Sequence, residues 1–175
     1  MADVNKKKFS DRQEKMVARY LGWHQVTGSG ARPGIPGDVT SREMNYLGEC
    51  KTFTSLKDSI KFQINHWIKI DEEATLQFKQ PALFTDDGTQ LPDHTFCIAR
   101  IVNSDKFNQP IPYHIRSTED DSLFKINKSS IVIPDMLAFK KFLDDNDVQG
   151  IVFTLNKQNL IITTLEKFNE ILEVV

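Results

Sequence analysis

Two stretches in the first half of the chain carry apolar residues at the spacing of an α-helix. The first covers residues 10–21, where Ser10 fits the N-cap position and Gly22 would end the helix. The second begins at Ser55 and runs to residue 77. Its apolar positions fit one long helix: Leu56, Ile60, Ile64, Trp67, Ile68 and Ala74.

Short apolar runs predict strands between and after these two helices. The runs are residues 23–27, 38–41, 46–53, 81–85 and 95–101. Residues 28–37 contain four glycines and two prolines in ten positions, which excludes a regular element and predicts a loop. A turn near residues 42–45 would join the second and third strands.

The rest of the chain is less regular. Residues 103–130 are polar and carry no clear period, and residues 130–134 predict an edge strand. Pro134 at the first helical position would open a helix through residue 142. A hairpin over 150–155 and 159–163 and a helix over 165–172 would complete the chain. The fold class predicted is α/β: a mixed central sheet flanked by helices.

Composition narrows the class of protein. The chain has 175 residues with 39% hydrophobic and 26% charged positions, which is typical of one globular domain. No apolar run reaches the roughly 18 residues of a membrane span, and the N-terminus lacks the apolar stretch of a secretory signal. We therefore expect a protein inside a cell, of cellular or phage origin. Cys50 and Cys97 are the only cysteines, which disfavours a disulfide framework or a cysteine-ligated zinc site.

Positive and negative charges are distributed unevenly along the chain, although the net charge is small. Net charge is −2, but residues 1–69 hold 12 Lys/Arg and 7 Asp/Glu, whereas the remainder holds 10 and 17. Such asymmetry fits contact with DNA through one face, and a chance fluctuation in a solvated surface is the alternative.

One acidic residue and a Glu-x-Lys triplet carry the candidate chemistry. Asp38 lies on one predicted strand and Glu49-Cys50-Lys51 on the next. Because side chains alternate along a strand, Glu49 and Lys51 should project together while Cys50 points into the core. Phosphodiester hydrolysis needs a divalent cation, an activated water and a group that orients the water. The two carboxylates and the backbone carbonyl of Cys50 would hold the cation, and Lys51 would orient the water or stabilise the transition state. A surface Glu–Lys pair is the alternative interpretation.

These residues resemble the signature of the PD-(D/E)XK nuclease superfamily, with Asp38 followed by Glu49-Cys50-Lys51. Gly37 stands where many members have proline. The resemblance implies an αβββαβ restriction-endonuclease-like core over residues 1–101, with residues 102–175 as an accessory α/β extension of the same domain. Archaeal and phage Holliday-junction resolvases are the most similar subgroup.

The resemblance assigns three further candidates, each with a plainer alternative. Glu14 matches a helix glutamate that helps to bind metal, although it could be a solvated surface residue. Ser29 resembles a loop serine that approaches the scissile phosphate, although turn chemistry explains it too. Gln63 and Trp67 resemble a helical Gln-x-x-x-Tyr motif, which would place Gln63 at the active site.

Basic residues near the motif could bind DNA phosphates. Arg32 lies in the Gly/Pro loop and Arg42 in the strand turn, so both are close to the candidate site in sequence. The other basic positions are the N-terminal run and a helical pair: Lys6, Lys7, Lys8, Lys57 and Lys61. The four histidines show no metal-binding spacing, and the Gly/Pro loop lacks the Gly-Lys-Ser/Thr of a nucleotide-binding loop. We therefore expect no nucleotide cofactor.

The function expected is a metal-dependent DNA endonuclease. The resemblance implies Mg²⁺ or Mn²⁺ as cofactor, a 5′-phosphate product and a preference for branched DNA. It also suggests a homodimer if the substrate is a junction, because two symmetric strands must then be cut. Two alternatives stay open: a restriction- or repair-type endonuclease acting on duplex or single-stranded DNA, and a nucleic-acid-binding protein that keeps the fold without catalysis.

Overall fold

The computed structural model is an α/β fold with a mixed central sheet. It describes residues 2–26, 37–41, 43–100, 114–116 and 122–174. The elements of the first half are α1 (Ala2–Leu21), β1 (His24–Gln25), β2 (Val39–Ser41), β3 (Tyr46–Lys51), β4 (Ile60–Gln63), α2 (Ile64–Leu76), β5 (Gln80–Asp86), the 3₁₀ helix η1 (Pro92–His94) and β6 (Thr95–Arg100). Those of the second half are β7 (His114–Ile115), β8 (Lys125–Ile126), β9 (Ser130–Ile133), α3 (Met136–Asp145), β10 (Ile151–Leu155), β11 (Gln158–Thr164) and α4 (Leu165–Val174).

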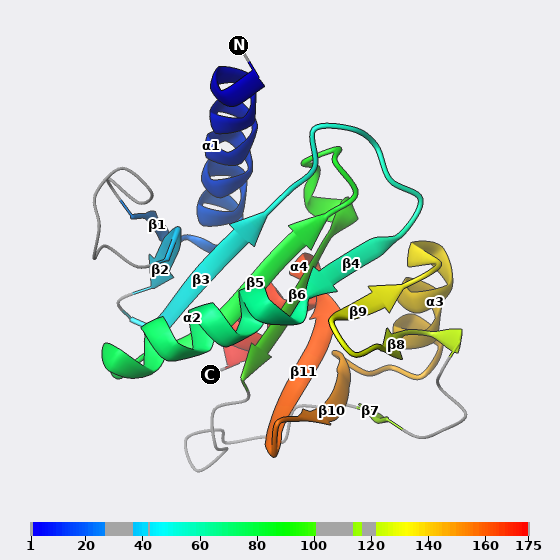
Figure 1. The fold of residues 1–175 in the computed structure, drawn as a ribbon. Helices are drawn as coiled ribbons and strands as arrows, with labels where there is room; N and C mark the ends of the chain where they lie inside the picture. The colour runs from blue at the N-terminus through cyan, green and yellow to red at the C-terminus, as the bar shows by residue number, and fades with distance from the viewer. Residues whose placement is uncertain (1, 27–36, 42, 101–113, 117–121, 175) are drawn as a thin grey trace.

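The described strands form two sheets (Figure 1). The larger has the order β1-β2-β3-β5-β6-β11-β10-β7, with β3 parallel to β5 and β7 parallel to β10. Its other neighbouring pairs are antiparallel. The smaller has the order β4-β9-β8 and is antiparallel. Strands from both halves of the chain therefore share each sheet.

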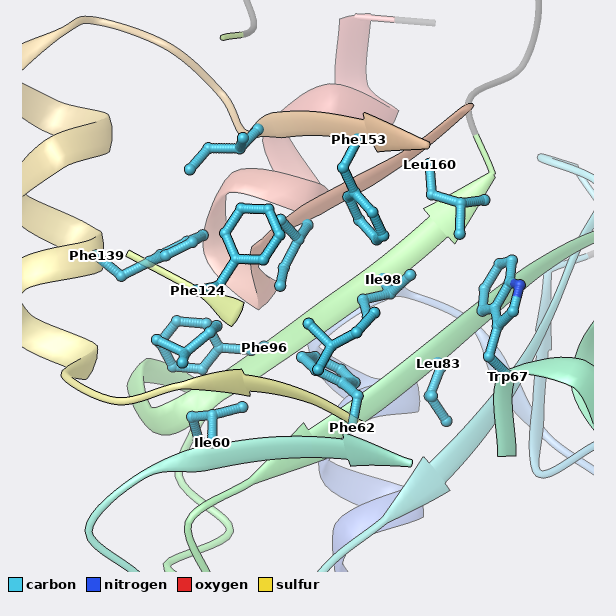
Figure 2. Close-up of a cluster of buried hydrophobic side chains, with 14 of the residues drawn as sticks. Ile60, Phe62, Trp67, Leu83, Phe96, Ile98, Phe124, Phe139, Phe153 and Leu160 are labelled. Atoms are coloured by element: carbon cyan, nitrogen blue, oxygen red, sulfur yellow. The ribbon is translucent and has the colours of Figure 1, made fainter. Parts of the chain in front are cut away.

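Each face of the large sheet has its own apolar core. α1 and α4 cover one face, where Trp23, Phe84 and Phe168 pack edge to face. α2, the small sheet and α3 cover the other face (Figure 1). Figure 2 shows how the aromatic rings of that second core meet, with Phe96 of the large sheet against Phe139 of α3.

The small sheet corrects two predictions. Residues 60–63 are strand β4 and not part of the helix predicted from Ser55. Ile60 and Phe62 point into the core, Lys61 is exposed, and the strand pairs with β9. α2 therefore begins only at Ile64. The predicted edge strand at 130–134 is β9, the central strand of this sheet, since β4 and β8 pair with its two edges.

Helix boundaries also differ from prediction at two places. α1 begins at Ala2, so Ser10 lies inside the helix and Lys6–Lys8 are helical. α3 begins after Asp135, whose side chain accepts a hydrogen bond from the amide of Ala138 at 3.1 Å. Pro134 therefore precedes the N-cap. The hairpin β10–β11 and the C-terminal helix α4 are confirmed. None of the described helices combines the length and the apolar character needed to cross a membrane.

Candidate active site

Asp38 is held in place by main-chain hydrogen bonds on both sides. Its amide donates to the carbonyl of Gly48 at 2.8 Å, and its carbonyl accepts from the amide of Val26 at 2.8 Å. Gly37 precedes it with φ +75°, and a Cβ there would lie 2.6 Å from Cδ1 of Leu47. Proline cannot adopt that φ, which gives the glycine at this position a physical reason.

At the end of β3, the main-chain N–H and C=O groups of Cys50 face the candidate site. In the part of the chain that the structure describes, β2 pairs with β3 only as far as Val39 and Gly48, and no strand there faces Cys50 on that side. The Cys50 amide instead donates to Oδ2 of Asp38 at 2.8 Å. Because the N–H and C=O of one strand residue point to the same side, the Cys50 carbonyl is directed toward Asp38 as well.

Cys50 itself is a packing residue. Its side chain is buried in the core that α1 and α4 cover. Burial raises the pKa of its thiol well above the usual value, and the nearby carboxylates raise it further. The thiol therefore stays protonated and is not a nucleophile.

Glu49 and Lys51 project to the same face of the sheet, as predicted from strand alternation. Nζ of Lys51 lies 3.3 Å from Oε1 of Glu49. The side chain of Glu49 is 8% exposed and that of Lys51 is 40% exposed. The amine is thus reachable from solvent while the carboxylate beneath it is buried.

Glu14 joins the site from α1. Its carboxyl group lies beside the carboxyl group of Asp38. Its Oε2 also accepts from Nε2 of Gln25 at 2.8 Å, and the same Nε2 donates to Oδ1 of Asp11 at 2.8 Å. The structure therefore brings together four residues named from the sequence: Glu14, Asp38, Glu49 and Lys51.

The carboxylates of this site repel one another. Burial, followed by the negative charge of Asp38, raises the pKa of Glu14 to about 7 and that of Glu49 to about 7. Lys51 and Lys69 oppose the shift at Glu49 without cancelling it. The cluster is thus short of positive charge at neutral pH.

A divalent cation fits this donor set. Mg²⁺ prefers oxygen ligands and commonly uses one or two carboxylates together with water and substrate phosphate. Asp38, Glu49 and the Cys50 carbonyl supply such oxygens. Among the described residues no group of three or more His, Cys, Asp or Glu side chains is arranged to hold a metal ion, so water and substrate would have to supply further ligands.

Helix α2 contributes a second row of polar groups that the sequence analysis missed. Burial, then the charges of Lys51 and Lys69, lowers the pKa of His66. Lys69 lies 3.9 Å from Glu73, and Glu73 accepts a hydrogen bond from the amide of Gly37 at 3.2 Å. The spacing of His66, Lys69 and Glu73 on one helix face was the available signal.

Gln63 is the N-cap of α2 and not, as the sequence had predicted, an interior residue of the helix. It is the last residue of β4, where it pairs with Ser130, and Trp67 is buried in the core. In the part of the chain that the structure describes, the Gln63 side chain makes no hydrogen bond to the site carboxylates. The prediction that Gln63 and Trp67 share one helical face was therefore wrong. Ser29, Arg32 and Arg42 lie outside the described residues.

A second acidic pair lies at the end of β5, the neighbour of β3. Asp87 accepts hydrogen bonds from Oγ1 of Thr89 at 2.7 Å and from Nδ1 of His94 at 2.7 Å. Burial alone would raise the pKa of Asp87, but these hydrogen bonds outweigh it and lower the pKa. Asp86 accepts from Thr52 at 2.7 Å through Oδ1. Its burial still raises its pKa, and its Oδ2 accepts no hydrogen bond from the described residues.

Comparison of this chain with models of protein families, with curated proteins and with solved structures gave no match.

Proposed function

We propose that this protein is a metal-dependent DNA endonuclease of the PD-(D/E)XK type. One observation carries the proposal: the buried carboxylates of Asp38 and Glu49 and the partly buried carboxylate of Glu14 lie beside a solvent-reachable amine at the end of β3. Carboxylates that share a site without enough positive charge are typical of a cation site. A solvent-reachable lysine next to them can orient the attacking water, as phosphodiester hydrolysis requires.

Each residue has a defined role in this proposal. Asp38 and Glu49 would hold Mg²⁺ or Mn²⁺ with the Cys50 carbonyl, and Glu14 would help to bind the metal, directly or through water. The cation, when bound, would offset the charge of the scissile phosphate and lower the pKa of a bound water.

Lys51 would act on the attacking water and the phosphate. Its Nζ would donate a hydrogen bond to the water and offset negative charge in the transition state. The water oxygen forms a bond to phosphorus while the bond from phosphorus to the 3′-oxygen breaks. The attacking water gives up a proton to solvent and the 3′-oxygen takes one from solvent, which leaves a 5′-phosphate and a 3′-hydroxyl.

The experiment compares Lys51→Ala with Lys57→Ala. Lys57 is exposed and its Nζ lies over the Phe53 ring at 5.4 Å, so it is a matched lysine outside the carboxylate cluster. In Mg²⁺, Lys51→Ala should lose cleavage of labelled DNA by about 10³-fold or more while DNA binding persists. Lys57→Ala should cleave like the unsubstituted protein. Equal cleavage by Lys51→Ala and the unsubstituted protein would overturn the mechanism.

The substrate is tested with a panel of DNA shapes. We propose branched DNA as the preferred substrate and a homodimer as the acting form. Four-way junctions, flaps, linear duplex and single strands should be compared at equal concentration. Equal cutting of linear duplex and junctions would remove the junction preference and favour the restriction- or repair-type alternative. Binding without cleavage in Mg²⁺ or Mn²⁺ would favour the non-catalytic alternative.

A further inference from the structure

An exposed row of basic side chains follows α1 on a face that the carboxylate site does not use. We name it the α1 basic stripe, and its members are Lys8, Arg12, Lys15 and Arg19. At 3.6 residues per turn these positions lie within about 60° of one another around the helix and span about 16 Å along it. Gln13 and Val17 of the same helix are buried against the sheet.

Most of the charge on the stripe is not neutralised. Lys15 pairs with Asp11 at 2.9 Å, and the Lys15 side chain remains 62% exposed. The Arg12 guanidinium lies over the ring of Phe9 at 5.6 Å. Within the described residues, none of the other three cations forms an ion pair with a carboxylate. The stripe therefore attracts a polyanion.

A groove accompanies the stripe. It has a volume of about 410 Å³ and is lined by Arg12, Lys15, Met16, Arg19, Tyr20 and Pro92. Long basic side chains present their alkyl stems to such a groove and keep their charged ends in water. A nucleic-acid backbone offers the complementary surface, with sugar rings between charged phosphates.

The stripe is connected to the candidate active site by hydrogen bonds. Glu14 and Asp11 share the amide nitrogen of Gln25 at 2.8 Å each, and Asp11 pairs with Lys15. Two side chains, Gln25 and Asp11, thus lie between Lys15 of the stripe and Glu14 at the site. DNA bound at the site would reach the stripe without leaving the surface of α1.

Acidic residues of α4 limit the stripe at its C-terminal end. Burial, then the charges of Glu166, Glu170 and Glu173, raises the pKa of Tyr20. A polyanion is repelled there and attracted toward Lys8. Figure 1 shows the N-terminal half of α1 projecting past the ends of the strands, which leaves that part accessible.

We propose that the α1 basic stripe binds the phosphate backbone of duplex DNA beside the strand held at the carboxylate site. The choice of DNA as the ligand rests on the proposed function. Duplex DNA carries about one charge per 1.7 Å of axis, so a row of about 16 Å faces several phosphates. The stripe would set affinity and orientation and would not read sequence.

The test compares two variants that each lose three positive charges. The stripe variant is Arg12→Gln, Lys15→Gln and Arg19→Gln together. The control variant is Lys125→Gln, Lys128→Gln and Lys141→Gln, at exposed positions of β8, the following turn and α3. Glutamine is a good helix former, so the stripe variant should keep its helix content by circular dichroism.

Binding of a labelled linear duplex would be measured in Ca²⁺ across about 50–200 mM salt. Each lost phosphate contact should reduce the slope of log affinity against log salt by about 0.9. The stripe variant should therefore lose about 2–3 in slope and bind at least about tenfold more weakly at low salt, while the control variant keeps slope and affinity. An unchanged slope and affinity in a folded stripe variant would overturn the proposal. Equally strong binding of a poly-glutamate peptide to the unsubstituted protein would overturn the assignment of DNA.

Cleavage in Mg²⁺ separates this inference from the proposed function. If both hold, the stripe variant should raise KM and leave kcat nearly unchanged, because the stripe does not touch the reacting atoms. Cleavage by the stripe variant with an unchanged KM would contradict the proposed role of the stripe and leave the proposed nuclease function standing. If the protein binds DNA through the stripe but never cleaves it, the proposed nuclease function is contradicted and the proposed role of the stripe is kept.

Discussion

Two acidic clusters lie at the ends of neighbouring strands, and their chemistry differs. At the end of β5, Asp87 is surrounded by donors, and hydrogen bonds from Thr89 and His94 lower its pKa. At the end of β3, Glu14 and Glu49 are crowded by Asp38, and their pKa values rise. Both clusters are largely buried, so burial alone does not separate them.

The two clusters differ in the source of the positive charge or hydrogen-bond donors that offset their carboxylates. The protein satisfies Asp87 with its own groups, which is typical of a carboxylate that stabilises a fold. It leaves the β3 cluster short of positive charge, which costs stability unless something outside the chain compensates. We therefore expect substitutions at the first cluster to affect stability, and substitutions at the second to affect activity.

The largest effect should follow Asp38→Asn. Loss of one carboxylate from the proposed cation site should reduce cleavage by about 10³-fold or more, equivalent to about 4 kcal/mol in the barrier. Stability should change little, because asparagine keeps an oxygen that can accept the hydrogen bond from Cys50. Single-turnover cleavage and thermal unfolding on the same preparation measure both. A fully active Asp38→Asn protein would remove the distinction between the clusters.

Asp87→Asn should show the reverse pattern. The amide keeps one acceptor but loses the charge that strengthens the hydrogen bonds from Thr89 and His94. We expect a loss of about 2–3 kcal/mol in the free energy of unfolding, measured by urea titration. Cleavage per folded molecule should be unchanged. A loss of cleavage without a loss of stability would place Asp87 among the functional carboxylates.

The pH dependence of stability should separate the clusters next. The pKa values of Glu14 and Glu49 are raised to about 7 in the folded protein, above their unfolded values. The folded state then binds more protons between about pH 4.5 and 7, so their contribution to stability is present at low pH and is lost as pH rises through 7. The lowered pKa of Asp87 acts in the opposite direction and only in acid.

Thermal unfolding from pH 5 to 8 in a chelator tests this expectation. Glu49→Gln should flatten the decline and stabilise the protein by about 1–2 kcal/mol at pH 8, below the full linkage value because Lys51 and Lys69 offset part of the repulsion. Adding Mg²⁺ at pH 8 should raise the Tm of the unsubstituted protein more than that of Glu49→Gln. An increase in stability with pH over this range would contradict the charge shortage.

The sequence allowed the β3 site to be predicted because its geometry is local. Alternation along one strand places Glu49 and Lys51 together and buries Cys50. Asp38 follows from the adjacent strand, which needs only a short turn. The contact of Glu14 was predicted only through family resemblance, because no local rule places a helix residue against a strand 24 positions later.

Other parts depend on contacts that no local pattern contains. Residues 60–63 fit a helical spacing and a strand spacing equally well, and pairing with β9 about 70 residues later decides for the strand. The donors around Asp87 lie between β5 and β6, a segment for which the sequence predicted only an interval between two strands. Gly37 has a positive φ, and the Leu47 side chain fills the space that a Cβ would take, and no local pattern predicts either feature.

Asp86→Asn should have the smallest effect, and it tests the contrast between the two clusters most sharply because Asp86 combines features of both. Its Oδ1 accepts hydrogen bonds from Thr52 at 2.7 Å and from the amide of Gly88 at 3.2 Å, as a structural carboxylate would. Its Oδ2 has no described donor, and burial raises its pKa, as at the β3 site. Asp86→Asn keeps Oδ1 and removes the buried charge, so we expect a change within about 0.5 kcal/mol in the free energy of unfolding at pH 8. Cleavage should stay within about twofold, since Asp86 holds Thr52 and not the substrate. A loss of cleavage comparable to that of Asp38→Asn would show that the ends of β3 and β5 form one functional site, and the contrast between the clusters would then fail.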